Sequence, residues 1–132
     1  MALKITLKPR ERIIVGGTVI TNGDKTADLV IENRVPVLRQ KDVMAEEEAD
    51  SPCRRIYFTV QLMYIDPARL SEYWTLYLKL AREVVLAAPS TFQMIDGIGE
   101  DIASGRYYRA LKKTRILIKY EKELMDHVRQ SA

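Results

Sequence analysis

The sequence predicts an α+β protein in which a small antiparallel β-sheet comes first and a bundle of about four helices follows. The first third consists of short β-branched runs separated by turn residues, whereas the remainder repeats apolar residues at helical spacing. The chain has 132 residues, of which 47% are hydrophobic and 30% charged, as in a single soluble globular domain. We expect a β region over residues 1–44 and a helical region over residues 45–132, packed as one compact unit.

Short apolar runs predict the strands of a small antiparallel sheet or half-barrel. In residues 3–7, apolar and polar side chains alternate, which is typical of a strand with one buried face. The further runs are residues 12–15, 18–21, 29–31 and 35–38. Pro36 indicates an edge strand or the start of a strand, because proline cannot donate to a ladder. The dipeptide Asn22-Gly23 predicts a tight hairpin turn, since both residues tolerate positive φ angles.

Residues typical of helix ends predict the helices. The first helix is expected over residues 51–64, with a serine N-cap and a proline in the first turn. Asp66-Pro67 and Pro89-Ser90 are expected to begin the second and third helices in the same way, and the third ends near Gly105. The last helix is expected from about residue 106 to residue 128.

Several classes of function lack the residues that they need. No apolar segment approaches the ~20 residues that cross a bilayer, and no signal-peptide core follows the first lysines, so we expect a cytoplasmic protein without a membrane partner. One cysteine, Cys53, and one histidine, His127, offer little for a metal site or a catalytic pair. The glycine pairs lack the spacing of a phosphate loop. We therefore expect neither an enzyme nor a bound cofactor or metal.

Charge is distributed unevenly along the chain. The net charge is only +3. Residues 45–51 contain acidic residues without any lysine or arginine, whereas the segments before and after them are basic. This pattern weakly favours an anionic partner.

The β region contains candidate RNA contacts. Alternation places Lys4, Thr6 and Lys8 on the face of the first strand opposite its apolar residues. Such a face can contact single-stranded RNA, and a solvated outer face fits the same pattern. The candidate RNA-binding residues are Lys4, Thr6, Lys8, Arg10, Arg12, Arg34 and Arg39.

A second basic surface is predicted on the last helix. Five cations recur there at helical spacing: Arg109, Lys112, Arg115, Lys119 and Lys122. They form either a solvated helix face or a footprint for nucleic acid or an acidic protein. Tyr107, Tyr108 and Tyr120 could stack on bases or pack against the other helices.

Aromatic residues of the helical region are candidates for protein contacts. Tyr57, Trp74 and Tyr77 lie on the apolar faces of the first two predicted helices. These faces serve either the core or a partner, such as a second copy of the chain.

Several segments, taken in order and spacing, resemble the FlbT family over nearly the whole chain. In the β region they are residues 8–17, 19–24 and 38–43, and in the helical region residues 55–58, 61–67 and 105–112. The resemblance implies post-transcriptional control of flagellin in alphaproteobacteria, through binding to the 5′ leader of flagellin messenger RNA and an effect on its translation or decay. It also implies the helical flagellar protein FlaF as a functional counterpart, and it leaves the sign of regulation open.

Residues 1–44 also resemble the carbon storage regulator CsrA. In that family, two interlocked chains form an RNA surface from the first strand and from an arginine in the last strand. The matching positions here are residues 4–8 and Arg39, so this resemblance implies RNA binding and a homodimer. The chain differs in having Arg10 where glycine is common.

Two functions follow from these patterns. The first is an RNA-binding regulator of flagellin synthesis that acts through the β region. The second is a protein-interaction module, a flagellin chaperone or an adaptor for FlaF, that acts through the helical region. Charge reversal of Lys4, Lys8 or Arg39 is expected to weaken RNA binding and to leave protein binding by the helical region unchanged.

Overall fold

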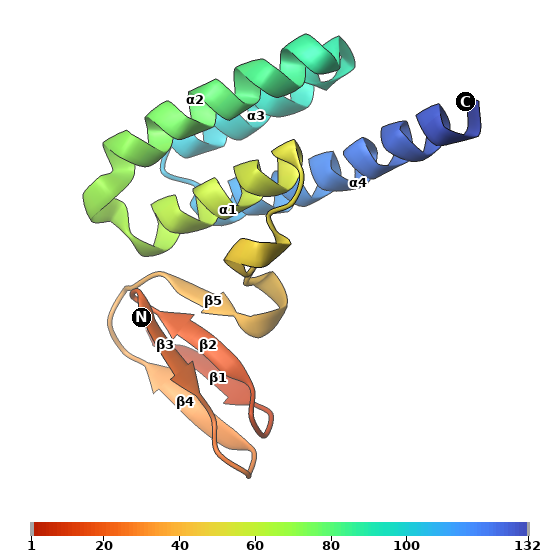
Figure 1. The fold of residues 1–132 in the computed structure, drawn as a ribbon. Coiled ribbons are helices and arrows are strands. Elements are labelled where there is room, and N and C mark those ends of the chain that lie inside the picture. Colours follow the sequence, from red (N-terminus) through yellow and green to blue (C-terminus); the bar gives the residue numbers. More distant parts are fainter. Residues whose placement is uncertain (1, 132) are drawn as a thin grey trace. The chain divides into compact units, whose positions relative to one another are not determined.

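The computed structural model describes residues 2–131 and divides into two compact units between Val43 and Met44. We call them the β unit and the helical unit. The strands of the β unit are β1 (Leu3–Leu7), β2 (Arg12–Val15), β3 (Thr18–Thr21), β4 (Ala27–Ile31) and β5 (Val37–Arg39). The helices of the helical unit are α1 (Pro52–Ile65), α2 (Leu70–Ala87), α3 (Phe92–Ala103) and α4 (Tyr107–Ser131) (Figure 1). The predicted α+β class is thereby confirmed, whereas the packing of the two regions as one compact unit stays a prediction.

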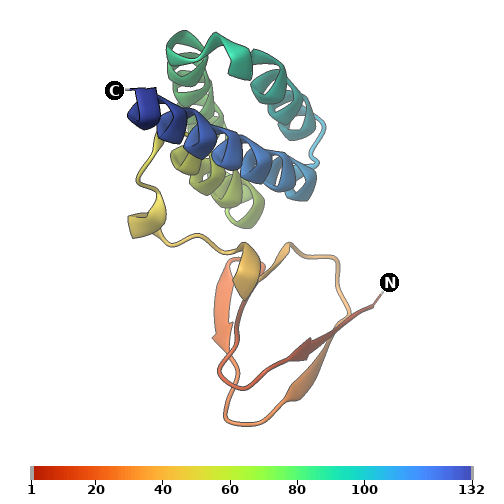
Figure 2. The same cartoon turned by 90° about the vertical axis from the view of Figure 1, so that its right-hand side faces the viewer.

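The strands of the β unit are antiparallel, as the sequence predicts, and they form two small sheets. β1 pairs with β4, and β2 pairs with both β3 and β5. Figure 2 shows the β1–β4 pair and the β2–β3 hairpin as separate ribbons joined by loops. Pro36 lies directly before β5, which is an edge strand, as its missing N–H requires.

The tight hairpin turn lies at Gly16-Gly17, so the prediction that Asn22-Gly23 forms it is wrong. Both glycines have positive φ angles, 56° and 87°, and they join β2 directly to β3. Positive φ angles at both central residues are those of a type I′ turn, whose twist matches that of the flanking strands. Asn22 follows β3 and has a different role, described below.

The core of the β unit is small. Ile5, Leu7 and Ile13 form its buried cluster, and Leu29 and Val37 are among the half-buried residues packed against it. The alternation predicted for β1 is confirmed over residues 4–7, where Lys4 and Thr6 are exposed and Ile5 and Leu7 are buried, whereas Leu3 is 48% exposed. A unit of this size buries a modest share of its surface, so its stability is expected to be marginal.

The helical unit is organised around α1. α1 packs against α2 and α4, and α3 packs mainly against α4 (Figure 1). Ile56, Val60 and Met63 of α1 are fully buried, as are Ile98 of α3 and Leu117 of α4. Among residues 2–131, no helix combines the length and the apolar character needed to cross a bilayer.

Only one of the three predicted helix caps forms as expected. The Ser51 side chain accepts a hydrogen bond from the Arg54 N–H at 3.2 Å, which confirms the start of α1. The other two helices begin later, each after one turn of 3₁₀ helix, at Leu70 and at Phe92. Asp66 instead accepts from the Tyr73 hydroxyl at 2.6 Å, which raises the pKa of Tyr73, and Ser90 bonds to the Tyr120 hydroxyl at 2.7 Å.

Candidate nucleic-acid interface

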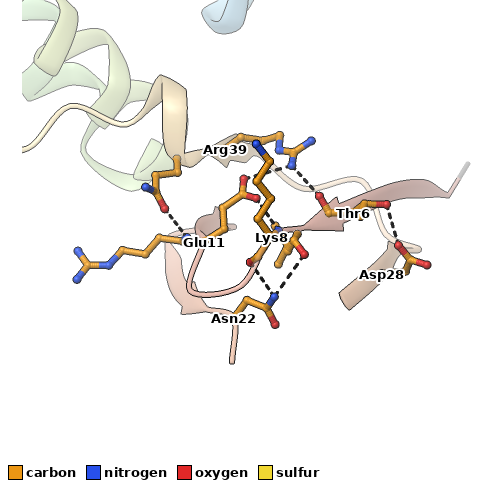
Figure 3. Close-up of polar contacts among 9 residues, drawn as sticks. Thr6, Lys8, Glu11, Asn22, Asp28 and Arg39 are labelled. Carbon is orange, nitrogen blue, oxygen red and sulfur yellow. Dashed lines mark hydrogen bonds and ion pairs between the residues drawn. The ribbon is translucent and has the colours of Figure 1, made fainter. Parts of the chain in front are cut away.

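Arg39 and Glu11 form the central ion pair of the β unit. Nη2 of Arg39 lies 3.2 Å from Oε2 of Glu11 and donates to the backbone carbonyl of Thr6 at 2.8 Å (Figure 3). Both contacts use one guanidinium nitrogen, and among the described residues the other two nitrogens have no acceptor within hydrogen-bond distance. With 40% of its side chain exposed, Arg39 is therefore anchored on one side and open on the other.

Glu11 also closes the turn that follows β1. Its Oε1 accepts from the Lys8 N–H at 2.9 Å, and its own N–H donates to the Lys8 carbonyl at 3.1 Å (Figure 3). The hydrogen bond from Lys8 lowers the pKa of the Glu11 carboxyl below its usual 4.5, and Arg39 adds to that effect against partial burial. The carboxylate therefore remains ionised and holds Arg39 in place.

Arg10 lies in a strained part of the same turn. Its φ angle is 66°, in the left-handed region that favours glycine, and its N–H donates to the Gly23 carbonyl at 2.9 Å. The side chain is 76% exposed and reaches Asp24 at 2.6 Å. The chain thus presents a cation at the position where its CsrA-like resemblance leads one to expect glycine.

Asn22 fixes the backbone of two segments. Its side-chain amide donates to the carbonyls of Lys8 at 2.8 Å and Lys25 at 2.9 Å, and more weakly to Leu7 at 3.4 Å (Figure 3). Its Oδ1 accepts from the Gly23 N–H at 2.9 Å. Asn22 thereby ties the end of β1 to the loop between β3 and β4.

These contacts gather four cations around one open depression, which we call the basic hollow. Its lining residues are Lys8, Pro9, Arg10, Glu11, Arg39, Gln40 and Lys41. It has a volume of about 680 Å³. Of the predicted RNA contacts, the hollow brings together Lys8, Arg10 and Arg39.

The other predicted contacts lie outside the basic hollow. Lys4 and Thr6 are exposed on β1, Arg12 at the start of β2, and Arg34 between β4 and β5. The exposed face of β1 is less basic than expected, because Thr6 pairs across the sheet with Asp28 and donates to its carboxylate at 2.7 Å. Cationic character is thus concentrated at the turn after β1 and at the end of β5.

Besides Pro9, three lining residues of the hollow are outside the set of RNA contacts predicted from the sequence. Lys41 follows β5 and adds the fourth cation. Gln40 accepts from the Arg12 N–H at 2.7 Å and so ties the end of β5 to β2. The third is Glu11. It follows Lys8 by three residues, a spacing in the sequence that is typical of a turn closed by a side chain.

The predicted basic stripe of α4 is exposed along its length, and its first three cations contact other residues of the helical unit. Arg109 lies 3.8 Å from the buried Asp101, and the Lys112 ammonium lies 5.0 Å from the centre of the Tyr108 ring. Arg115 donates to the Tyr57 hydroxyl at 3.2 Å. Lys119 and Lys122 form no ion pair with any described residue.

The predicted protein-contact residues differ in burial. Tyr57 and Tyr77 are each 2% exposed, so their rings belong to the core. The Tyr77 hydroxyl donates to the Ile95 carbonyl at 2.8 Å, and burial raises the pKa of Tyr77. Only Trp74, stacked on Tyr77 with ring centres 5.5 Å apart, is half-buried. A surface contact by Tyr57 or Tyr77 would therefore require the helices to rearrange.

The helical unit has an apolar groove between the end of α2 and the second half of α4, which we call the α4 groove. Its lining residues are Pro52, Cys53, Glu83, Val84, Ala87, Ala88, Ser90, Thr91, Glu121, Leu124, Met125, His127, Val128 and Arg129. Met125 is 50% exposed and Val128 66%. Cys53 is buried at the groove, and burial together with the Glu121 carboxylate raises the pKa of its thiol.

No metal centre accompanies these surfaces in the described part of the chain. Between residues 2 and 131, no three His, Cys, Asp or Glu side chains gather closely enough to hold a metal ion. The arrangement instead offers fixed cations and hydrogen-bond donors, which suit binding of an anion.

Comparison with known proteins gives one family. The profile of the family described as flagellar protein FlbT matches residues 3–125. A relative in Bradyrhizobium diazoefficiens, named a probable flagellum biosynthesis repressor protein FlbT, is 48% identical over 94% of this chain and 85% of its own length. A relative with a corresponding name in Rhodopseudomonas palustris is 42% identical over 96% of this chain and 99% of its own length. One in Caulobacter vibrioides is 36% identical over 97% of this chain and 92% of its own length. No solved structure matches the chain.

Proposed function

The chain belongs to the FlbT family, and from this premise we propose that it regulates flagellin synthesis after transcription by binding the 5′ leader of flagellin messenger RNA. The basic hollow of the β unit is the proposed RNA site. Because the relatives are named repressors, binding is expected to lower synthesis through reduced translation or faster decay of the message.

The observation that carries this proposal is the anchored guanidinium of Arg39 within a ring of four cations. The Thr6 carbonyl and Glu11 hold one of its nitrogens, so two remain for a phosphate oxygen or a base edge. Positioning in advance lowers the conformational entropy that binding would cost. Lys8, Arg10 and Lys41 supply the further positive charge that phosphates require.

The strained backbone of Arg10 supports the same site. A left-handed φ angle is unfavourable for every residue with a Cβ, and glycine would adopt it freely. Strain of this kind is typically retained where function requires it. Here the retained group is a largely exposed cation at the edge of the hollow.

The composition of the β unit defines how it would bind RNA. Every tyrosine, tryptophan and phenylalanine of the chain lies beyond residue 56, so the β unit has no aromatic ring on which a base could stack. Recognition would therefore depend on phosphate contacts and hydrogen bonds, and it should be strongly salt-dependent.

A matched pair of lysines tests the site. Lys8→Gln removes a cation of the hollow, and Lys25→Gln removes an exposed cation of the same unit outside it. In gel-shift titrations with a flagellin leader, Lys8→Gln should weaken binding severalfold and reduce the salt slope by about 0.7, the value for one contact to a single strand. Lys25→Gln should change neither quantity.

A third variant and a second RNA complete this experiment. Lys4→Gln distinguishes the hollow from the exposed face of β1, because it should affect binding only if that face is used. A scrambled RNA of equal length measures the preference for the leader. Equal behaviour of Lys8→Gln and Lys25→Gln, or no preference for the leader, would count against the proposal.

The α4 groove favours a second candidate function, binding of flagellin or FlaF by the helical unit. An apolar groove beside a long helix is a common site for an amphipathic helix of a partner. Val128→Asp places a charge in the groove, whereas Ile116→Asp changes a similarly exposed residue of α4 that does not line it. Loss of flagellin binding in the first variant alone, with RNA binding retained, would support this function.

A further inference from the structure

α2 and the start of α3 expose an apolar strip outside the core of the helical unit. Leu78 is 50% exposed, Leu86 71% and Phe92 58%. α2 is buried through Tyr77 and Leu80, among others, so the exposed residues lie on a different side of this helix. Leu78 and Phe92 also line the groove described next, and large apolar side chains exposed beside a groove are typical of an interaction site.

The strip continues into a groove between α2 and α3, which we call the α2–α3 groove. Its lining residues are Trp74, Tyr77, Leu78, Ala81, Arg82, Val85, Phe92, Ile95, Asp96, Gly99, Glu100 and Ala103. Gly99 of α3 lies at the base of the groove beside Tyr77 of α2, where a Cβ would make an ordinary van der Waals contact with the Tyr77 hydroxyl at 3.5 Å. The groove has a volume of about 470 Å³ and is separate from the α4 groove and from the basic hollow.

The two sides of the α2–α3 groove carry opposite charges that no ion pair among residues 2–131 neutralises. α2 contributes Arg82, and α3 contributes Asp96 and Glu100. All three are exposed, and none forms an ion pair with another described residue. Asp96 and Glu100 are four residues apart on one helix, a spacing at which like charges repel. A cation from outside the chain would remove that repulsion.

We propose that a second copy of this chain docks on the α2–α3 groove about a two-fold axis that runs along it. In such a pair each α2 faces the α3 of the other copy. Arg82 of each copy therefore lies opposite Asp96 and Glu100 of its partner, and the two-fold axis makes this contact occur two times. The apolar centre of the groove is buried between the two copies. The groove favours a second copy as its partner, because a two-fold rotation places the basic side of one groove opposite the acidic side of the other. A closed symmetric dimer requires a self-complementary surface of this kind.

Complementary charge reversals test this pairing. Arg82→Glu makes both sides of the groove acidic, and Asp96→Lys combined with Glu100→Lys makes both sides basic. Each variant alone should raise the dissociation constant of the dimer by about tenfold or more, through like-charge contact. An equimolar mixture should restore dimers, because each interface then joins an acidic side to a basic side.

Analytical ultracentrifugation over a range of concentrations measures the dimers, with circular dichroism as the check on folding. Glu72→Lys, a charge reversal on α2 outside the groove, should leave the dissociation constant unchanged. A wild-type chain that stays monomeric, reversals without effect, or a mixture that does not associate would each overturn the proposal. RNA binding by the basic hollow is measured separately, so its loss or retention does not decide this result.

Discussion

Glu11 joins three segments of the β unit through one carboxylate. One oxygen accepts from the Lys8 N–H at the end of β1, and the other pairs with Arg39 at the end of β5. The Glu11 backbone also accepts from the Asn22 N–H at 2.9 Å. An acidic residue among cations thus orients the site, although its charge opposes the binding of an anion.

Glu11→Gln tests this role through the pH dependence of stability. Because the folded-state pKa of Glu11 is lowered, its contribution is present above the usual value of 4.5 and is lost as pH falls through the lowered pKa. Wild-type β-unit stability should therefore decline on acidification through that window more steeply than that of Glu11→Gln. Hydrogen exchange of the Ile13 and Leu38 amides measures the stability of the β unit at each pH. The control is Glu32→Gln, which changes an exposed glutamate. Parallel pH profiles for Glu11→Gln and the wild type would contradict this role.

At the scale of secondary-structure elements, α4 stabilises the beginning of α1. Its Glu121 lies 2.5 Å from the Ser51 hydroxyl and accepts from the Cys53 N–H at 3.1 Å. A carboxylate at a helix N-terminus is favoured by the helix dipole and by the unpaired N–H groups there. Glu121 is the single acidic residue of the basic segment from Arg106 to Lys122, and these contacts give it a structural role.

Replacing Glu121 should therefore destabilise the helical unit. Glu121→Ala is expected to lower the free energy of unfolding by about 1–2 kcal/mol, as loss of a helix cap does. Urea unfolding followed by Trp74 fluorescence measures the change. Glu123→Ala, on the exposed side of the same helix, should have little effect, and an equal loss in both variants would refute the capping role.

Element prediction from sequence succeeded where the pattern was local. The alternation of β1 and the Ser51 cap depend on neighbouring residues, and both are confirmed. The caps expected from Asp66 and Ser90 failed because Tyr73 and Tyr120 take those oxygens. Competition of this kind depends on which helices meet, and no local pattern encodes that.

The candidate site required knowledge of the whole fold. Individual cations were recognisable from the sequence, but their grouping depends on long-range pairs such as Arg39 with Glu11, which are 28 residues apart. Likewise, the pairing of β1 with β4 places Asp28 beside Thr6 and makes the predicted strand face less basic. Strand register, rather than composition, therefore determined where positive charge gathers.

At the scale of the whole molecule, the two units should differ in stability. The β unit has a small core, whereas the helical unit buries residues from all four helices. In increasing urea, exchange protection of the strand amides should be lost before the fluorescence of Trp74 changes. Coincident transitions would show instead that the two units unfold as one cooperative structure.

The Asn22-Gly23 pair affects the chemical stability of the protein during long storage or prolonged unfolding. An asparagine before glycine loses ammonia when the glycine nitrogen attacks its side-chain carbon. In the folded chain that nitrogen bonds to Oδ1 of Asn22, and the amide is held by the carbonyls of Lys8 and Lys25. We expect folded molecules to lose this amide slowly. In unfolded molecules the attack expels ammonia and leaves a cyclic imide, which water opens to an aspartate or isoaspartate whose carboxylate cannot donate to those carbonyls. Chains kept unfolded for long would then refold less completely. Mass spectrometry of urea-incubated samples before and after refolding would detect the mass change at Asn22 and its depletion from the refolded fraction.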